Sequence, residues 1–122
     1  MEHRIVHFEI PADDPEKLTR FYAELFGWKV EKYPMPGWDY WGCKTGEGPG
    51  INGAIMKRMS PQHCITNYVN VEQLDAMLDK AKRLGANVIV PKTAVASMGW
   101  FAIALDPQNN PIGLWQADGA AK

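Results

Sequence analysis

Two residues whose side chains can carry protons, His7 and Glu9, stand two positions apart near the start of the chain. Val6, Phe8 and Ile10 alternate with them, which is the period of a strand with one apolar face. His7 and Glu9 therefore share the other face, as a polar anchor, a general acid–base pair, or both. The structural alternative is a partly buried histidine bonded to Glu9 or to a backbone carbonyl, beside a solvated or salt-bridged carboxylate.

These residues open a pattern that the sequence contains twice. Residues 7–10 lead into a helical segment that ends at Gly27, and residues 66–69 lead into a second one that ends at Gly85. Further segments with strand character follow each helix, separated by turn residues: 28–33, 39–44 and 51–57, then 87–90, 99–105 and 112–116. Each half is therefore expected to be β-α-β-β-β, which makes the fold class α+β.

The ends of both helices carry recognisable signals. Asp14 is placed as an N-cap before Pro15, and Gly27 ends the first helix. Asn70 and Gln73 form a variant capping box before the second helix. The apolar stripe of the first helix is expected to pack on the Val6, Phe8 and Ile10 face; its members are Leu18, Phe21, Tyr22, Leu25 and Phe26.

Strand alternation then predicts which other side chains point into a cleft between the two halves. The repeat places Thr66 and Tyr68 on the same side as His7 and Glu9. Alternation within the last two strands adds Trp100 and Trp115 as an aromatic lining. The alternative for both tryptophans is a place in the core. A register error of one residue would exchange the two faces of a strand.

The composition of the chain limits the kinds of molecule that it is expected to bind. The chain has 122 residues, 46% of them hydrophobic, and a formal net charge of -1, so nothing in its charge favours nucleic acid or an anionic membrane. It contains no apolar run of membrane-spanning length, and residues 1–4 lead directly into a strand, so we expect a cytoplasmic protein. Cys43 and Cys64 form no C-x-x-C pair, so both are expected to be small, mostly buried thiols rather than disulfide or zinc-site residues.

Residues 6–16, 21–22 and 25–28 resemble the first module of the vicinal oxygen chelate superfamily, also called the glyoxalase/bleomycin-resistance/dioxygenase family. Residues 99–102, 106–107 and 112–116 resemble the end of its second module. The resemblance implies a single domain over residues 1–122, with modules at about 3–59 and 62–117 that form an open barrel around a central cleft, and a flexible tail at 118–122. It also implies a homodimer, and the aromatic side chains of Trp38, Tyr40 and Trp41 are candidates for the subunit interface.

Metalloenzymes of this family carry His or carboxylate ligands on the first and last strands of each module, because a divalent ion that activates substrate oxygens needs such donors. Of those positions, His7 matches, but the others fall on Thr66, on Gly113 and near Gly53 and Ala54. We therefore expect no cofactor. A divalent metal ion is expected only if His7, Glu9 and a partner-chain residue rebuild the site.

Two functions follow from the resemblance. The first is a metal-independent protein that binds a small, partly aromatic molecule. The alternative is a metal-dependent enzyme that uses His7 and Glu9, either a glyoxalase similar to lactoylglutathione lyase or a ring-cleaving dioxygenase of the extradiol type. A structural or regulatory subunit with an empty cleft is a third possibility.

Overall fold

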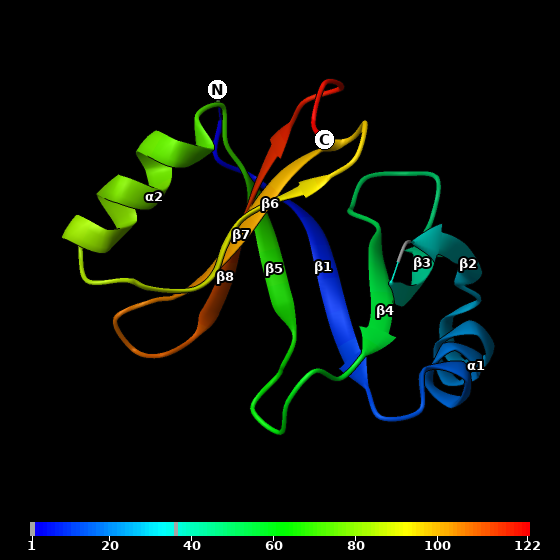
Figure 1. Ribbon diagram of the computed structural model, residues 1–122. Coiled ribbons are helices and arrows are strands. Elements are labelled where there is room, and N and C mark those ends of the chain that lie inside the picture. Colours follow the sequence, from blue (N-terminus) through cyan, green and yellow to red (C-terminus); the bar gives the residue numbers. More distant parts are fainter. Residues whose placement is uncertain (1, 36) are drawn as a thin grey trace. The chain divides into compact units, whose positions relative to one another are not determined.

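The computed structural model describes residues 2–35 and 37–122, which form eight strands and two helices in the order β-α-β-β-β-β-α-β-β-β (Figure 1). The elements are β1 (Ile5–Ala12), α1 (Pro15–Phe26), β2 (Lys29–Met35), β3 (Trp38–Lys44), β4 (Gly53–Lys57), β5 (Thr66–Asn70), α2 (Leu74–Arg83), β6 (Asn87–Val95), β7 (Gly99–Leu105) and β8 (Pro111–Ala117). The predicted α+β class and both β-α-β-β-β modules are confirmed.

The chain divides into two compact units, each with four strands and one helix. One unit is His7–Thr66, with the strand order β2-β3-β4-β1, and β1 runs parallel to β4. The other unit combines the residues up to Val6 with Asn67–Lys122, and its order is β5-β8-β7-β6 with β5 parallel to β8. The remaining pairs inside each unit are antiparallel. The same order of pairing in both units is what the sequence repeat predicts.

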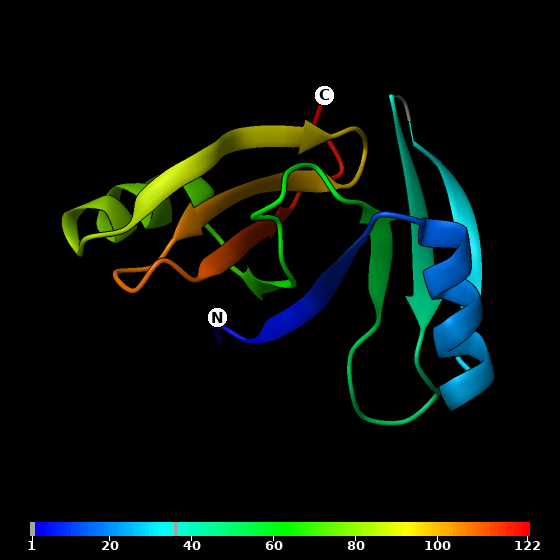
Figure 2. The same cartoon turned by 90° about the horizontal axis from the view of Figure 1, so that it is seen from below.

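Helix α1 begins and ends where its sequence signals place it. The Asp14 carboxylate accepts a hydrogen bond from the Lys17 N–H at 3.2 Å, and Pro15 is the first helical residue. Gly27 ends the helix in the left-handed conformation at φ 73°, which glycine adopts without steric cost. Within its unit, α1 lies against one face of the sheet (Figure 2).

The core beneath α1 is smaller than the sequence predicts. Its buried residues are Ile10, Ala12, Cys43 and Ile55, and the partly buried side chains around them are Phe8, Leu18, Tyr22, Trp28, Val30 and Trp41. Phe8 and Ile10 therefore face α1 as expected. Three members of the predicted helix stripe, Phe21, Leu25 and Phe26, are 54 to 60% exposed and are not part of the buried core. At the edge of this core the Phe26 ring contacts Trp28, with ring centroids 5.4 Å apart. Val6 is also exposed rather than part of this core.

Helix α2 begins differently from the prediction. Its N-cap is Gln73, whose side chain makes no capping hydrogen bond, so the predicted Asn70–Gln73 capping box is wrong. The backbone N–H of Leu74 instead donates to the Gln116 side chain of β8, at 2.8 Å. A residue 42 positions away thus satisfies a donor at the helix start, and no local pattern could show it.

Strand β6 runs well past the predicted segment 87–90. It extends to Val95 through Pro91, which cannot donate to a ladder. The pairing with β7 shifts register between Val88 and Val90 and again between Val90 and Thr93, so the irregularity accommodates the proline. As the last strand of its unit, β6 can hold a proline with little loss of pairing.

The residues expected as a tail, 118–122, make defined contacts. The Ser97 N–H donates to the Ala121 carbonyl at 2.9 Å, and Ala121 is 3% exposed. Asp118 accepts a hydrogen bond from the indole N–H of Trp100 at 3.0 Å. This bond lowers the pKa of the Asp118 carboxyl below its ordinary value.

Candidate functional site

The sheet face of the first unit that lies opposite α1 carries His7 and Glu9. Phe8 and Ile10 contact the core on the helix side, so strand alternation turns their neighbours to the other face. Glu9 lies beside Ala54 of β4, and Ala54 lies beside Gly42 of β3. Because these two neighbours are small, a long side chain from β3 has room to cross β4 and reach β1.

Tyr40 is the side chain that makes this crossing. Its hydroxyl oxygen lies 2.7 Å from Nε2 of His7, and its O–H donates to Oε2 of Glu9 at 2.9 Å. The rings of His7 and Tyr40 are stacked, with centroids 6.4 Å apart and planes 16° from parallel. His7, Tyr40 and Glu9, called the polar trio below, therefore form one hydrogen-bonded group.

The direction of these bonds fixes the protonation of His7. A tyrosine hydroxyl has one hydrogen, and Tyr40 gives it to Glu9. The short contact between Tyr40 and Nε2 of His7 must then use a hydrogen on that nitrogen. With Glu9 ionised, His7 is therefore the tautomer with hydrogen on Nε2, and the order of donation is His7 to Tyr40 to Glu9.

Burial sets the charges of the trio. Glu9 is only 8% exposed, one of the buried polar residues of the chain. His7 is half-buried, and this desolvation lowers its pKa below the ordinary 6.5, because a charged imidazolium loses hydration there. At neutral pH His7 is therefore uncharged, which suits a hydrogen-bond donor or a proton acceptor.

Aromatic side chains surround the trio on the same face. The ring of Trp38 lies 6.1 Å from that of Tyr40, at 43°. Tyr33 lies opposite Tyr40 in the β2–β3 ladder, and its ring covers Gly42, where an added Cβ would clash with the ring. A planar or apolar ligand would therefore find aromatic surface beside a buried carboxylate.

Sequence reasoning missed the role of Tyr40. Trp38, Tyr40 and Trp41 are predicted together as candidates for a subunit interface. In the structure Trp41 packs against the core beneath α1, and Tyr40 bonds to His7 and Glu9. The missing information was the pairing of β3 with β4 and of β4 with β1, which brings residues 31 and 33 positions apart into contact. The glycine at 42 and the alanine at 54 were the available signal.

Three more predicted residues lie on or near β5 and β8. The Thr66 hydroxyl donates to the Cys64 carbonyl at 3.2 Å, and Thr66 is 1% exposed. Tyr68 is 4% exposed and makes an edge contact with Phe101 of β7. The ring of Trp115 covers Gly99, the first residue of β7. Tyr68, Phe101 and Trp115 therefore share one sheet face of the second unit.

The predicted orientation of Trp100 is wrong. Trp100 packs against the core under α2, whose buried residues are Val71, Leu74, Leu78, Ala102 and Leu114. Its ring also lies 4.6 Å from the Lys92 ammonium. In β7 it is therefore Trp100 and Ala102 that face the helix, and Phe101 that faces away. The strand reads as apolar on both faces, so alternation could not determine its register.

The residues present do not match the metal ligands of the family. A sheet partner of Glu9 is Ala54, which has no donor, and Tyr68 covers the position at Gly113 where a side chain would stand. Nε2 of His7 is already bonded to Tyr40. Within residues 2–35 and 37–122, no three His, Cys, Asp or Glu side chains come together in a group that could hold a metal ion.

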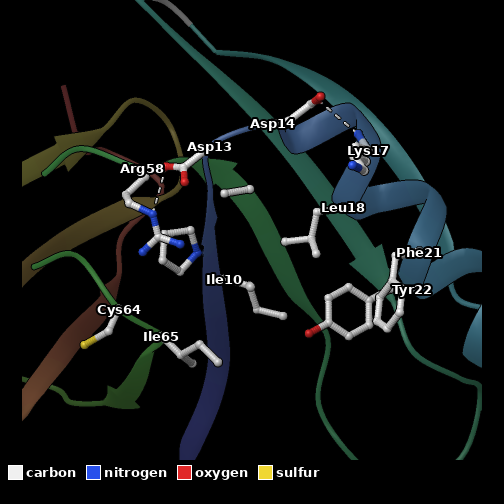
Figure 3. Close-up of a pocket in the computed structure, with 12 residues that line it drawn as sticks. Ile10, Asp13, Asp14, Lys17, Leu18, Phe21, Tyr22, Arg58, Cys64 and Ile65 are labelled. Carbon is white, nitrogen blue, oxygen red and sulfur yellow. Dashed lines mark hydrogen bonds and ion pairs between the residues drawn. The ribbon is translucent and has the colours of Figure 1, made fainter. Parts of the chain in front are cut away.

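A hollow of about 620 Å³ lies on the opposite, helix side of β1 (Figure 3). Its lining is mainly apolar: Ile10, Pro11, Ala12, Leu18, Phe21, Tyr22 and Ile65, with Asp13, Asp14, Lys17, Arg58 and Cys64. Arg58 bonds to the Asp13 carboxylate at 3.0 Å on its rim. None of the predicted site residues lines this hollow, so the polar trio, with its buried polar groups, is the better candidate for a chemical site.

Two β-α-β-β-β modules, each with a parallel β-strand pair and one helix, define a protein of the vicinal oxygen chelate class. A model of the Glyoxalase/Bleomycin resistance protein/Dioxygenase superfamily matches residues 4–114. The chain belongs to this superfamily, as the sequence resemblance implies.

The relatives extend this assignment. The chain is 26% identical over 119 residues to proteins named "Putative glyoxylase CFP32" from Mycobacterium bovis and Mycobacterium tuberculosis. The alignment covers 90% of this chain but 44% of those proteins, so the chain spans less than half of their length. Among solved structures, hypothetical protein BH1468 from Bacillus halodurans superposes with a TM-score of 0.73 at 13% identity, covering 100% of this chain and 99% of that one. Methylmalonyl-CoA epimerase from Mycobacterium tuberculosis gives 0.71 at 13% identity, covering 93% and 87%. These likenesses establish the fold.

Neither α1 nor α2, nor any other helical stretch in the described part of the chain, has the length and apolar character needed to cross a membrane.

Proposed function

We propose that this protein binds a small organic molecule on the sheet face that carries the polar trio, and that it does so without a metal ion. The observation that carries the proposal is the bonding of Tyr40 to both His7 and the buried Glu9. Burying a carboxylate and an imidazole costs free energy, and a strand needed only for packing would not contain them. Tryptophan and tyrosine rings beside the trio supply the apolar contact area that a ligand needs.

The donor set supports the metal-independent form of this proposal. Hard divalent ions require several N or O ligands. The positions that supply such ligands in the family's metalloenzymes fall on Thr66, on Gly113 and, in the fourth strand, near Gly53 and Ala54. His7 alone provides a typical ligand, and its Nε2 atom is already hydrogen-bonded to Tyr40.

An enzyme of the glyoxalase or dioxygenase type is the second candidate. A neutral imidazole joined to a carboxylate through a phenol is an arrangement that can accept a proton and stabilise the charge that results. The name of the mycobacterial relatives also suggests glyoxalase chemistry. In this reading His7 and Glu9 are the catalytic groups, and Tyr40 orients them.

One experiment separates these functions. The purified protein is analysed for metals and melted with and without added Mn²⁺, Fe²⁺, Ni²⁺ and Zn²⁺, and a library of small aromatic compounds is screened by tryptophan fluorescence. Binding that Tyr40→Phe weakens, in protein free of metal, would support the proposal. Stoichiometric metal that raises the melting temperature, and that His7→Ala removes, would support the enzyme instead. If no compound binds with millimolar or better affinity, the proposal of a binding protein is rejected. The third possibility, a structural subunit with an empty cleft, then remains.

We further propose a cytoplasmic homodimer. Cys43 and Cys64 are both free, which suits a reducing compartment. Phe21, Leu25 and Phe26 expose a continuous apolar face of α1, and such faces commonly mark contacts between subunits. On the second unit, the face that carries Tyr68 and Trp115 is a candidate surface for ligand contact. Thr66, the last residue of the first unit, is a separate candidate contact residue.

A further inference from the structure

We propose that the hollow on the helix side of β1 is a second binding site, and that it takes an apolar molecule with one carboxylate head. The hollow lies within the His7–Thr66 unit, on the opposite side of β1 from the polar trio, so this site is independent of the function proposed above. Three observations carry the proposal: the apolar lining, the charged groups gathered at one end, and an ammonium group there that has no partner.

The apolar part of the hollow is open to solvent. Ile10, Leu18 and Tyr22 form its wall on the side of the core beneath α1, whereas Phe21 and Ile65 are each 54% exposed. Covering apolar surface of this kind removes it from water and is favourable. The volume of about 620 Å³ lies within the range of pockets that hold small organic ligands. An apolar ligand body therefore has both space and contact area here.

The charged residues that line the hollow are gathered at one end of it. Strands β1 and β4 are parallel, so the residues that follow them lie at the same edge of the sheet. Asp13 and Asp14 follow β1, Arg58 follows β4, and Lys17 lies in the first turn of α1. These four side chains occupy the upper part of Figure 3, and the labelled apolar ones lie below them. The lining therefore matches a ligand with an apolar body and an ionic head.

The balance of charge at this end favours an anionic head. The Asp13 carboxylate pairs with Arg58 at 3.0 Å, and the Asp13 carbonyl accepts a hydrogen bond from the Lys57 ammonium at 2.7 Å. The Asp14 carboxylate accepts the Lys17 N–H as the N-cap of α1, where the helix dipole offsets its charge. Three cationic side chains thus accompany two carboxylates, and both carboxylates already accept hydrogen bonds.

Lys17 supplies the contact for the head. Its bond to Asp14 uses the backbone N–H, and among the described residues its ammonium group forms no hydrogen bond or ion pair. A ligand carboxylate can therefore pair with this ammonium group without displacing another partner. Because Lys17 is exposed, the pair adds only about two- to fivefold to the affinity. Most of the affinity must come from the apolar body.

The test uses three probes of one shape, octanoate, octanol and octylammonium, on the full chain. Binding is measured by calorimetry and by the rate at which iodoacetamide, a neutral reagent, alkylates Cys64 at constant pH. Cys64 is exposed and lines the hollow, whereas Cys43 is buried and reacts slowly. Octanoate is expected to bind most tightly and to slow the alkylation, octanol to bind about two- to fivefold more weakly, and octylammonium to bind most weakly.

Three variants identify the groups that make the contacts. Lys17→Gln should weaken octanoate about two- to fivefold and leave octanol unchanged. Arg20→Gln is the matched control, because Arg20 is an exposed cation on the same helix outside the lining of the hollow. Ile65→Glu should weaken both probes, since it places a charge in the apolar part, and the exposure of Ile65 lets the fold accept the change.

Three results would overturn the proposal. Octylammonium binding as tightly as octanoate would reject the anionic head. Failure of all three probes to protect Cys64 at millimolar concentration would reject the site itself. Protection of Cys64 that rises with protein concentration, without any probe, would show that a second copy of the chain covers the hollow. None of these results bears on the polar trio, whose own test uses Tyr40→Phe.

Discussion

Tyr68 of β5 lies over Gly113 of β8, its direct neighbour in the parallel ladder. A Cβ atom at position 113 would fall 2.3 Å from the tyrosine ring, and three ring atoms would lie within 2.8 Å of it. The ring therefore occupies the space of a missing side chain. This relationship gives a packing reason for the glycine at the position where metalloenzymes of the family are expected to carry a ligand.

Gly113→Ala should destabilise the protein, because the buried tyrosine ring must move to admit a methyl group. We expect a loss of about 1–3 kcal/mol in the free energy of unfolding, measured in urea. Gly48→Ala is the control, since nothing lies within 4 Å of a Cβ there. In the double variant Gly113→Ala/Tyr68→Ala, the loss in the free energy of unfolding should be smaller than the sum of the losses in the two single variants. Full additivity would mean that the ring does not depend on the glycine.

Tyr40→Phe should destabilise the protein and change the NMR titration of His7. Removing the hydroxyl takes a hydrogen bond from the buried Glu9 and an acceptor from His7. We expect a loss of about 1–3 kcal/mol, because the buried carboxylate loses a partner without regaining water. The NMR titration of His7 should also shift. Tyr33→Phe, which changes the 47% exposed tyrosine opposite it, should leave both quantities unchanged.

Stability should fall as the pH is lowered through the range in which histidine is protonated. The folded-state pKa of His7 lies below the ordinary 6.5, so the unfolded chain binds the proton more readily. The contribution of His7 is therefore complete above that value and is lost as the pH falls through the folded pKa. Tyr40 bonds to His7, and Glu9 in turn bonds to Tyr40.

The measurement is urea unfolding between about pH 7.5 and 5, where histidine titrates. His63→Gln is the necessary second variant, because burial and the Arg58 charge also lower the pKa of His63. His7→Gln should flatten the profile by the larger amount, since His7 is the more deeply buried of the two. If His7→Gln leaves the slope of unfolding free energy against pH unchanged, the burial of a neutral His7 imidazole is contradicted.

Local patterns in the sequence were sufficient for most of the fold. The repeat predicted the order of strands and helices, and the Asp14 cap and Gly27 predicted both ends of α1. Predictions from patterns within one strand or one helix are correct because the interactions that produce these patterns lie between neighbouring residues. The faces of β1 were also correct, because His7 and Glu9 interrupt an otherwise apolar strand.

The errors came from pairings between distant segments. Strand β7 has apolar residues on both faces, so its alternation could not show that Trp100 faces the helix. The start of α2 depends on Gln116, and the role of Tyr40 depends on two strand pairings. In each case the partner is fixed by tertiary structure rather than by neighbouring residues.

Phe26→Glu should convert the proposed dimer into a monomer. Phe26 is 60% exposed on α1, beside Leu25 at 57% and Phe21 at 54%. A carboxylate placed in an apolar interface would be buried without a partner. The control is Leu84→Glu, which changes a 70% exposed leucine after α2. Sedimentation equilibrium should give a dimer for the parent chain and for Leu84→Glu. A dimeric Phe26→Glu would locate the interface elsewhere.

The two cysteines should differ sharply in their reaction with a thiol reagent such as dithiobis(nitrobenzoate). Cys43 is 2% exposed in the core beneath α1, and burial raises its pKa to about 11, so little thiolate forms at pH 8. Cys64 is exposed and lines the hollow, so the expectation that both cysteines are mostly buried is wrong for Cys64. One thiol per chain should therefore react promptly in the folded protein and two in urea. Cys64→Ser should abolish the prompt reaction and Cys43→Ser should preserve it. Prompt reaction of both thiols without urea would show that the core beneath α1 opens readily, as its small size and the exposure of Phe21, Leu25 and Phe26 would allow in a monomer.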